Sequence, residues 1–108
     1  MSRGLATSTV FHAIADSTRR SVLRALGNGE CTVTDLLRVT RASQSALSQH
    51  LAVLRRARLV AQRQEGRYRW YRVRRPTPLR QVANWVEFFE RFWEVRFRSL
   101  EGYLDRRR

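Results

Sequence analysis

Short uncharged side chains grouped for hydrogen bonding are the clearest chemical feature of this sequence. The segment Ser43 to Val60, SQSALSQHLAVLRRARLV, predicts an amphipathic helix. Its first turns expose serine and glutamine, where most solvent-facing helices carry lysine and glutamate. Hydroxyl and amide groups both donate and accept hydrogen bonds. Such a helix start either caps itself or hydrogen-bonds to an outside partner.

The overall charge indicates what that partner would be. Twenty-two basic residues, all arginine, stand against nine acidic ones, which gives a net charge of +13 over 108 residues. A surface this positive attracts polyanions, so nucleic acid is the first candidate partner and an anionic membrane is the second. Genome-driven arginine use would explain arginine over lysine, but it does not explain the excess over acidic residues.

Few residues suit catalysis, cofactor binding or metal binding. No nucleophile–base pair, metal-ligand cluster or glycine-rich phosphate loop is recognisable, so the sequence predicts neither an enzyme nor a cofactor. Asp16, Glu30 and Asp35 are interpreted as caps and helix-end charges. The single cysteine, Cys31, permits no internal disulfide and favours the cytoplasm. No apolar run approaches the roughly 18 residues that span a bilayer, so no membrane partner is expected.

The hydrophobic pattern predicts four helices before residue 60. They are a short helix carrying Val10, Phe11 and Ile14, one from Asp16 to Leu26, one from Thr32 to about Val39, and one from Ser43 to about Ala57. Asp16, Ser43 and the Thr32–Asp35 pair are predicted N-terminal caps. The segment Gly27-Asn28-Gly29 is expected to stop the second helix, because glycine at the position after a helix adopts the left-handed conformation readily.

Beyond Leu59 the pattern changes to alternation. The segment VAQRQEGRYRWYRV, residues 60–73, has Glu65-Gly66 at its centre and predicts a β-hairpin with a glycine turn. Alternation places side chains on two faces, Arg67, Arg69, Tyr71 and Val73 on one, and Tyr68, Trp70 and Arg72 on the other.

The C-terminal region predicts one long helix from Leu79 to Asp105. Its broad apolar stripe contains Val82, Trp85, Val86, Phe89, Phe92, Trp93, Phe97, Leu100, Tyr103 and Leu104. A small monomer has little core left for such aromatics, so the stripe indicates an interface between two identical chains. The alternative is a monomer that folds this helix over the first two. Aromatic crevices there could also hold an apolar ligand, and Arg96 could pair with Glu94, a subunit partner or an anion.

Together these elements predict a mainly α fold with a small β-hairpin, a winged helix-turn-helix. Its helix pair is joined by a three- to four-residue turn and followed by a hairpin wing. One domain is expected over 1–108, with core and wing at 10–75 and the last helix at 77–105. The second helix of such a pair enters the major groove, where glutamine pairs with adenine and serine with several bases. The wing residues Arg63, Gln64, Arg67 and Arg69 would lie near a minor groove or flanking phosphates.

The sequence resembles the ArsR (arsenic repressor) family of winged-helix regulators over about Val10 to Val73. The resemblance rests most specifically on ADSTRR, SQSALSQHLAVLRRARLV and EGRYRWYRV. It implies a homodimeric transcriptional repressor that binds double-stranded DNA at an imperfect inverted repeat. The implied DNA-binding residues are Arg41, Ser43, Gln44, Ser45, Ser48, Gln49, His50, Arg63, Gln64, Arg67 and Arg69. The implied dimer interface comprises Val10, Ile14, Val82, Trp85, Val86, Phe89, Phe92, Trp93, Phe97 and Leu100, from the first and last helices.

The sequence departs from the family pattern at its metal sites. Where the ArsR motif ELCVCDL carries two cysteines, ECTVTDL (residues 30–36) has Thr32 and Thr34. One thiol cannot form a thiolate cage, and the last helix contains neither histidine nor cysteine. We therefore expect no metal sensing. Cys31 is interpreted as structural, with a redox role requiring a second thiol.

Some alternatives stay open from the sequence alone. The charge would equally suit a non-specific architectural DNA-binding protein, and an apolar inducer at the dimer interface would give a ligand-released repressor. His50 is expected to contact a backbone phosphate, with a local hydrogen bond as the alternative. A peripheral membrane protein is disfavoured because the polar face of the last helix has mixed charge.

Overall fold

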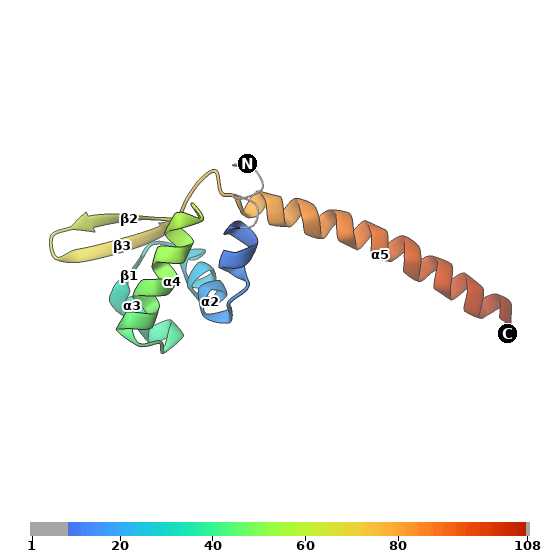
Figure 1. The fold of residues 1–108 in the computed structure, drawn as a ribbon, viewed down its shortest axis with the longest axis horizontal. Helices are drawn as coiled ribbons and strands as arrows, with labels where there is room; N and C mark the ends of the chain where they lie inside the picture. The colour runs from blue at the N-terminus through green and yellow to red at the C-terminus, as the bar shows by residue number, and fades with distance from the viewer. Residues whose placement is uncertain (1–8, 108) are drawn as a thin grey trace.

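The computed structural model describes residues 9–107, without the side chains of Phe97, Tyr103 and residues 105–107. Residues 9–14 are helical. The labelled elements that follow are α2 (Ser17–Leu26), β1 (Cys31–Thr32), α3 (Val33–Thr40), α4 (Gln44–Arg56), β2 (Val60–Glu65), β3 (Tyr68–Val73) and α5 (Leu79–Arg107). This order, drawn in Figure 1, confirms the winged helix-turn-helix predicted from the pattern.

In the body of the molecule, residues 9–73, helices α2, α3 and α4 each start at the predicted cap. The Asp16 carboxylate accepts from the Arg19 backbone N–H, and the Ser43 hydroxyl accepts from that of Ala46. Thr32 and Asp35 form a reciprocal capping box at the start of α3. Because a side-chain acceptor satisfies an N–H that has no partner inside the helix, these short motifs fix the helix starts locally.

The end of α2 differs from the expectation for Gly27. Gly27 keeps right-handed helical angles (φ −62°, ψ −23°), and the positive φ falls two residues later, at Gly29 (φ 135°). The N–H of Gly27 bonds the carbonyls of Leu23 and Arg24, so the helix tightens by one further turn before the chain reverses. The predicted stop after Leu26 is confirmed, but Gly29 rather than Gly27 has the positive φ.

The wing is a hairpin in a three-stranded antiparallel sheet of order β1–β3–β2. Val60 pairs with Val73 and Glu65 with Tyr68 across the hairpin, while Cys31 pairs with Tyr71 on the other side. Gly66 turns the chain with φ 62°, a conformation that glycine adopts without steric penalty. The two-residue β1 therefore fastens the base of the wing to the start of α3.

The core lies where the helices of the body meet the base of the wing. It consists of Val10, Ala13, Val22, Leu26, Leu36, Leu47, Leu51, Leu54, Ala57, Leu59, Val60 and Tyr71. Val10 is only 1% exposed and belongs to this core. It offers no surface to a second chain, so we correct the expectation that it contributes to a dimer interface.

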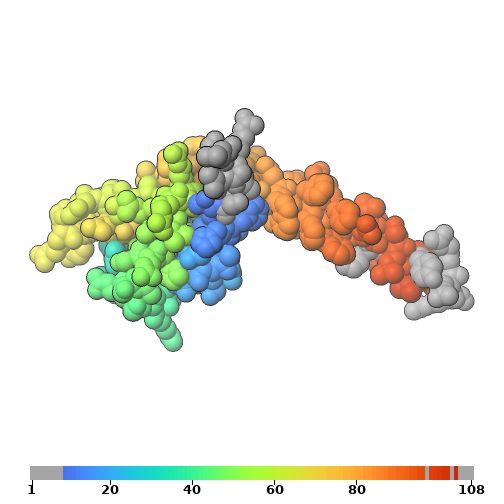
Figure 2. Space-filling model, in the orientation of Figure 1, coloured from blue at the N-terminus to red at the C-terminus, as the bar shows by residue number. Residues whose placement is uncertain are grey.

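Helix α5 projects away from the body (Figures 1 and 2). The molecule measures 68 × 34 × 22 Å with a radius of gyration of 18.8 Å, against roughly 13 Å for a compact chain of this length. Leu79 and Val82, near its start, pack against the core. The alternative in which a monomer folds this helix over its first two helices is therefore wrong.

None of the helices described over residues 9–107 combines the length and the apolar character needed to cross a bilayer.

Candidate nucleic-acid interface

The first turns of α4 present a polar surface to solvent. Leu47, Leu51 and Leu54 are buried on the opposite side and anchor the helix to the core. The predicted contact residues on the outer side are all exposed, namely Ser43, Gln44, Ser45, Ser48 and Gln49. Had the fold buried Ser45 or Gln49, a recognition role would have been impossible. Their hydroxyl and amide groups can instead meet base edges or phosphates.

A three-residue connection sets how α4 follows α3. Residues 41–43 lie between the two helices, and Arg41 adopts the left-handed conformation (φ 57°) as the C-cap of α3. Its N–H donates to the carbonyl of Leu37 over 2.9 Å. The Arg41 side chain is exposed beside the start of α4.

A groove of about 420 Å³ lies between α3, α4 and the wing. Gln44 and Ser48 line it from α4, and Arg67, Tyr68 and Arg69 line it from the hairpin. Both arginines are exposed, and within residues 9–107 neither forms an ion pair with a carboxylate. Residues about twenty positions apart in the sequence thus line one groove. Hydrogen-bonding side chains of α4 form one wall, and cationic side chains of the wing form another.

Arg63 does not join this surface as expected. Its guanidinium binds Glu30 through two hydrogen bonds of 2.9 and 3.1 Å and Glu65 through a third of 2.7 Å. It also lies over the Trp70 ring, 5.4 Å from the centroid. The hydrogen bonds from Arg63 lower the pKa of Glu30, and those carboxylates raise the pKa of Arg63. We therefore correct its predicted role, because two carboxylates already neutralise it and hold it to the wing.

Gln64 lies near the hairpin tip and is exposed. Its amide nitrogen donates to the Gly66 carbonyl over 3.4 Å. This long bond holds the side chain loosely against the turn, so Gln64 is a weaker candidate for DNA contact than Arg67 or Arg69.

His50 lies on the flank of α4 and bonds within the protein. Its Nδ1 is 3.2 Å from Nη1 of Arg19 and 3.8 Å from the Asp16 carboxylate. Nδ1 of His50 therefore makes the local hydrogen bond that was the alternative to a phosphate contact. Sequence reasoning missed Arg19, although it stands in the quoted segment ADSTRR, because nothing in the pattern shows that an arginine of α2 will be buried.

Large apolar side chains are exposed along α5. Trp85 is 51% exposed, and Val86, Phe89, Phe92, Trp93 and Leu100 are similarly open. The aromatic rings pack on one another, with Trp85 and Phe89 stacked at 5.1 Å and Phe89 and Trp93 edge-to-face at 5.5 Å. Ile14 and Val82 are half-buried at the base of the helix. Phe97, also predicted at the interface, has a side chain outside the described residues. We call this set, from Val82 to Leu100, the α5 stripe.

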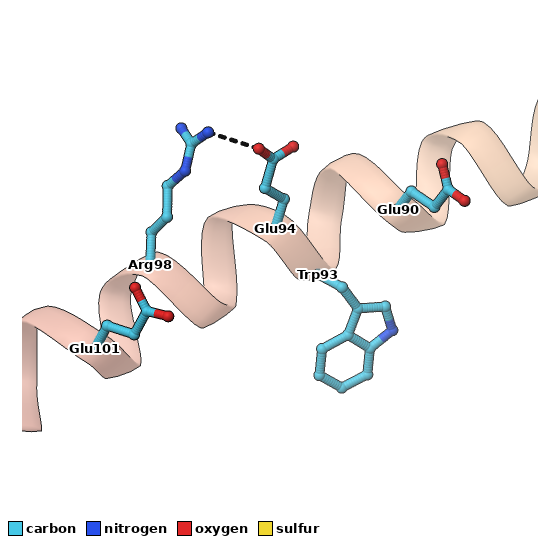
Figure 3. Close-up of a pocket in the computed structure, with 5 residues that line it drawn as sticks. All are labelled: Glu90, Trp93, Glu94, Arg98 and Glu101. Atoms are coloured by element: carbon cyan, nitrogen blue, oxygen red, sulfur yellow. Dashed lines mark hydrogen bonds and ion pairs between the residues drawn. The ribbon is translucent and has the colours of Figure 1, made fainter.

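Charged residues of α5 contact both the stripe and one another within the same helix. Arg96 lies over the Phe92 ring at 4.9 Å, and Glu94 pairs with Arg98 one turn on. A hollow of about 780 Å³ is lined by Glu90, Trp93, Glu94, Arg98 and Glu101. Figure 3 shows the Trp93 side chain pointing away from the Glu94–Arg98 pair. All the lining residues come from one helix, so the hollow is an open flank and encloses no ligand by itself.

The region of the family's cysteine motif is structural in this chain. Thr32 and Asp35 cap α3, and burial raises the pKa of the Cys31 thiol, which disfavours the reactive thiolate. Within residues 9–107 no three His, Cys, Asp or Glu side chains come close enough to hold a metal ion.

Comparisons with known proteins agree with this geometry. A family profile described as "Bacterial regulatory protein, arsR family" matches residues 16–62. The chain is 39% identical to the HTH-type transcriptional regulator Rv2034 of Mycobacterium tuberculosis, over 88% of this chain and 82% of that protein. It is 32% identical to the transcriptional repressor SdpR of Bacillus subtilis, over 73% and 87% respectively. An ArsR-like transcriptional regulator from Rhodococcus sp. RHA1 superposes with a TM-score of 0.71 at 26% identity, covering 94% and 92% of the two chains.

Proposed function

This chain belongs to the ArsR family of bacterial regulatory proteins, whose members are DNA-binding transcription regulators rather than enzymes; we propose that it is a homodimeric repressor of an inverted-repeat operator that does not sense metal. The observation that carries the proposal is the exposed serine and glutamine face of α4. It lies beside a groove that the exposed wing residues Arg67 and Arg69 also line. A solvated helix face has no need of so many short hydrogen-bonding groups. A major groove does, because each base pair presents a distinct pattern of donors and acceptors there.

The dimer part of the proposal rests on the α5 stripe. Its aromatic side chains stand in solvent on a helix that leaves the body, and exposed apolar patches of this kind mark interfaces. Pairing two identical stripes about a twofold axis would cover both at once. The two copies of α4 would then be about 34 Å apart, the spacing of successive major grooves on one side of B-DNA.

The metal-independent part rests on the residues that replace the cysteine motif. The Thr32 hydroxyl accepts a hydrogen bond from the Asp35 N–H over 3.2 Å, and the Asp35 carboxylate accepts one from the Thr32 N–H over 3.0 Å. Both side chains serve the start of α3. Thr32 and Thr34 thus offer hard hydroxyl oxygens where the motif has thiolates, and the Thr32 hydroxyl is engaged in the cap. Hydroxyl oxygens are poor ligands for soft metal ions, so another signal, or simple autorepression, would control DNA binding.

Footprinting on the DNA upstream of the protein's own gene tests the proposal. We expect a protected inverted repeat that survives a large excess of unrelated competitor DNA, with one dimer bound per site. Zinc or arsenite added to the complex should leave the footprint in place. A footprint that competitor DNA removes would assign the architectural role instead, and release by either metal would disprove the metal-independent part.

A further inference from the structure

Arg19 is the most buried charged residue described in the body, at 9% exposure. Its Nε donates to the Ala13 carbonyl over 2.7 Å, and its Nη2 donates to the His12 carbonyl over 2.9 Å. Its Nη1 lies 3.2 Å from Nδ1 of His50. A buried charge is tolerated only with such partners, so all three nitrogens of the guanidinium are committed to fixed positions.

These partners come from two different elements. The carbonyls of His12 and Ala13 belong to the last turn of the helix over residues 9–14, where helical partners run out. His50 belongs to the middle of α4. One side chain of α2 therefore ties the end of the first helix to the recognition helix, and the Asp16 carboxylate lies 3.8 Å from the same imidazole nitrogen.

The position of His50 makes this tie directional. His50 lies about 100° around α4 from Gln49, between the buried leucines and the exposed polar face. Apolar packing of Leu47, Leu51 and Leu54 is non-directional, and it tolerates a small rotation of α4 about its axis. A hydrogen bond weakens steeply away from its preferred angle, so the Arg19–His50 contact selects one rotation and hence which side chains face outward.

The tie also reaches the base of α5. Phe11, on the same short helix, meets the Trp85 ring edge-to-face with centroids 6.0 Å apart. A continuous set of contacts thus runs from Trp85 through Phe11 and its helix to Arg19, His50 and the polar face of α4.

We propose that Arg19 is a positioning residue for DNA recognition, which through His50 fixes the rotation of α4 relative to the helix over residues 9–14 and the base of α5. The inference rests on the proposed function, since it requires that α4 select an operator. Arg19 itself touches no DNA in this scheme. Because a guanidinium only donates hydrogen bonds, Nδ1 of His50 is the acceptor in this contact.

The neighbouring arginine supplies a matched control. Nη1 of Arg20 donates to the carbonyls of Ile14 and Ala15, each over 3.0 Å, at the same chain reversal. Its side chain is exposed, and its hydrogen bonds go to this segment rather than to α4. Replacing either arginine by lysine keeps the charge and perturbs the end of the first helix, but only Arg19→Lys disturbs the link to α4.

The test compares binding to the operator with binding to unrelated DNA for the full-length dimer. We expect Arg19→Lys to lower the ratio of specific to non-specific affinity at least tenfold, and Arg20→Lys to change it less than twofold. Thermal unfolding and circular dichroism, recorded in parallel, identify any loss of folded protein. An unchanged ratio in a folded Arg19→Lys protein would overturn the inference.

Variants of His50 keep the inference testable if Arg19→Lys folds poorly. His50→Leu removes the acceptor and should lower the ratio as Arg19→Lys does, whereas His50→Gln retains an acceptor and should stay within about threefold of the native ratio. Because the two residues act through one bond, the losses in Arg19→Lys and His50→Leu should not add in the double variant. Additive losses would overturn the inference.

Two further outcomes separate this inference from others. A salt dependence that falls by about one unit in His50→Leu would identify a lost phosphate contact and would replace positioning with direct binding. If the native protein binds the operator no more tightly than unrelated DNA, the proposed function is wrong, and this inference is wrong as well. If the native protein discriminates and Arg19→Lys discriminates equally, only the inference fails.

Discussion

The body of the molecule and its last helix carry the same kind of apolar periodicity and meet opposite fates. In α4 the leucines at helical spacing are buried, with Leu47 and Leu54 fully inaccessible. In α5 the aromatic residues at the same spacing stand in solvent, and Trp85 keeps half of its surface exposed. Periodicity therefore establishes that a helix has an apolar face, but it does not say which chain supplies the cover.

Polar residues show the same contrast between the two regions. In the body, arginines find specific partners, as Arg19 does with backbone carbonyls and Arg63 does with two carboxylates. Along α5 the charges pair within one helix, as Glu94 and Arg98 do. Arginines of the body thus have partners from other elements, whereas the ion pair of α5 joins neighbouring turns of one helix and leaves the apolar stripe exposed.

The largest effect should come from the α5 stripe. We expect Phe89→Ser to weaken the dimer at least a hundredfold and to abolish operator binding at nanomolar protein, because each dimer loses two aromatic side chains from a packed interface. Sedimentation velocity and electrophoretic mobility shifts measure the two losses. The body should still unfold cooperatively, since Phe89 is not part of its core.

Phe88 is the matched control for this variant. Phe88 is the aromatic residue next to Phe89 in α5, and its side chain is 62% exposed. It lies outside the predicted stripe. Phe88→Ser should change dimer affinity much less than Phe89→Ser. Equal losses from both substitutions, or a native protein that sediments as a monomer at micromolar concentration, would remove the stripe as the dimer interface.

A smaller effect, of about tenfold, is expected on the polar face of α4. Gln44→Ala and Ser48→Ala should relax sequence choice at one or two operator positions, because each base-edge contact contributes about 1–3 kcal/mol of discrimination. Both side chains are exposed, so thermal stability should be unaffected. Binding to a set of single-base operator variants provides the measurement. If both proteins keep the native preference at every position, these residues do not contact bases.

The wing arginines sharpen the comparison between paired and unpaired charge. Arg67→Ala should weaken binding to all sequences and reduce the salt dependence by about one unit for the lost phosphate contact. Arg63→Ala should leave that salt dependence nearly unchanged, since Glu30 and Glu65 already bind its guanidinium. Binding titrations at several salt concentrations measure both. An equal fall for the two variants would restore Arg63 to the DNA surface.

The smallest effect concerns the cap of α3 and is confined to the body. Hydrogen bonds from Thr32 lower the pKa of Asp35 below its ordinary value of 3.8. The charged carboxylate therefore stabilises the fold above about pH 4, and this contribution disappears as the pH falls through the lowered pKa. Asp35→Asn should lower the stability by about 1 kcal/mol at neutral pH.

Thermal unfolding at pH 7 and at pH 2.5 checks the sign of this effect. The difference between native and Asp35→Asn proteins should be a few degrees at pH 7 and should shrink in acid. A difference that stays constant between the two conditions would show that the charge of Asp35 contributes nothing.

Local signals in the sequence predicted much of the body. The caps at Asp16, Thr32 and Ser43 and the turn at Gly66 all follow from a residue and its neighbours within three or four positions. The conformation of Gly27 was a local error, but the errors at the arginines arose where the deciding contact was distant. Glu30 precedes Arg63 by 33 positions and Arg19 precedes His50 by 31, so no window of sequence reveals either pairing.

The sequence by itself determined the order of the elements, the caps that start them and the polar character of the first turns of α4. These features depend on backbone hydrogen bonds and side-chain periodicity, which act over a few residues. Only the tertiary structure decided which arginines bind partners within the protein and that Val10 belongs to the core. It also decided that α5 extends away from the body with its aromatic stripe exposed. Those outcomes depend on which surfaces meet after folding, and charge neutralisation and apolar burial are properties of meeting surfaces rather than of neighbouring residues.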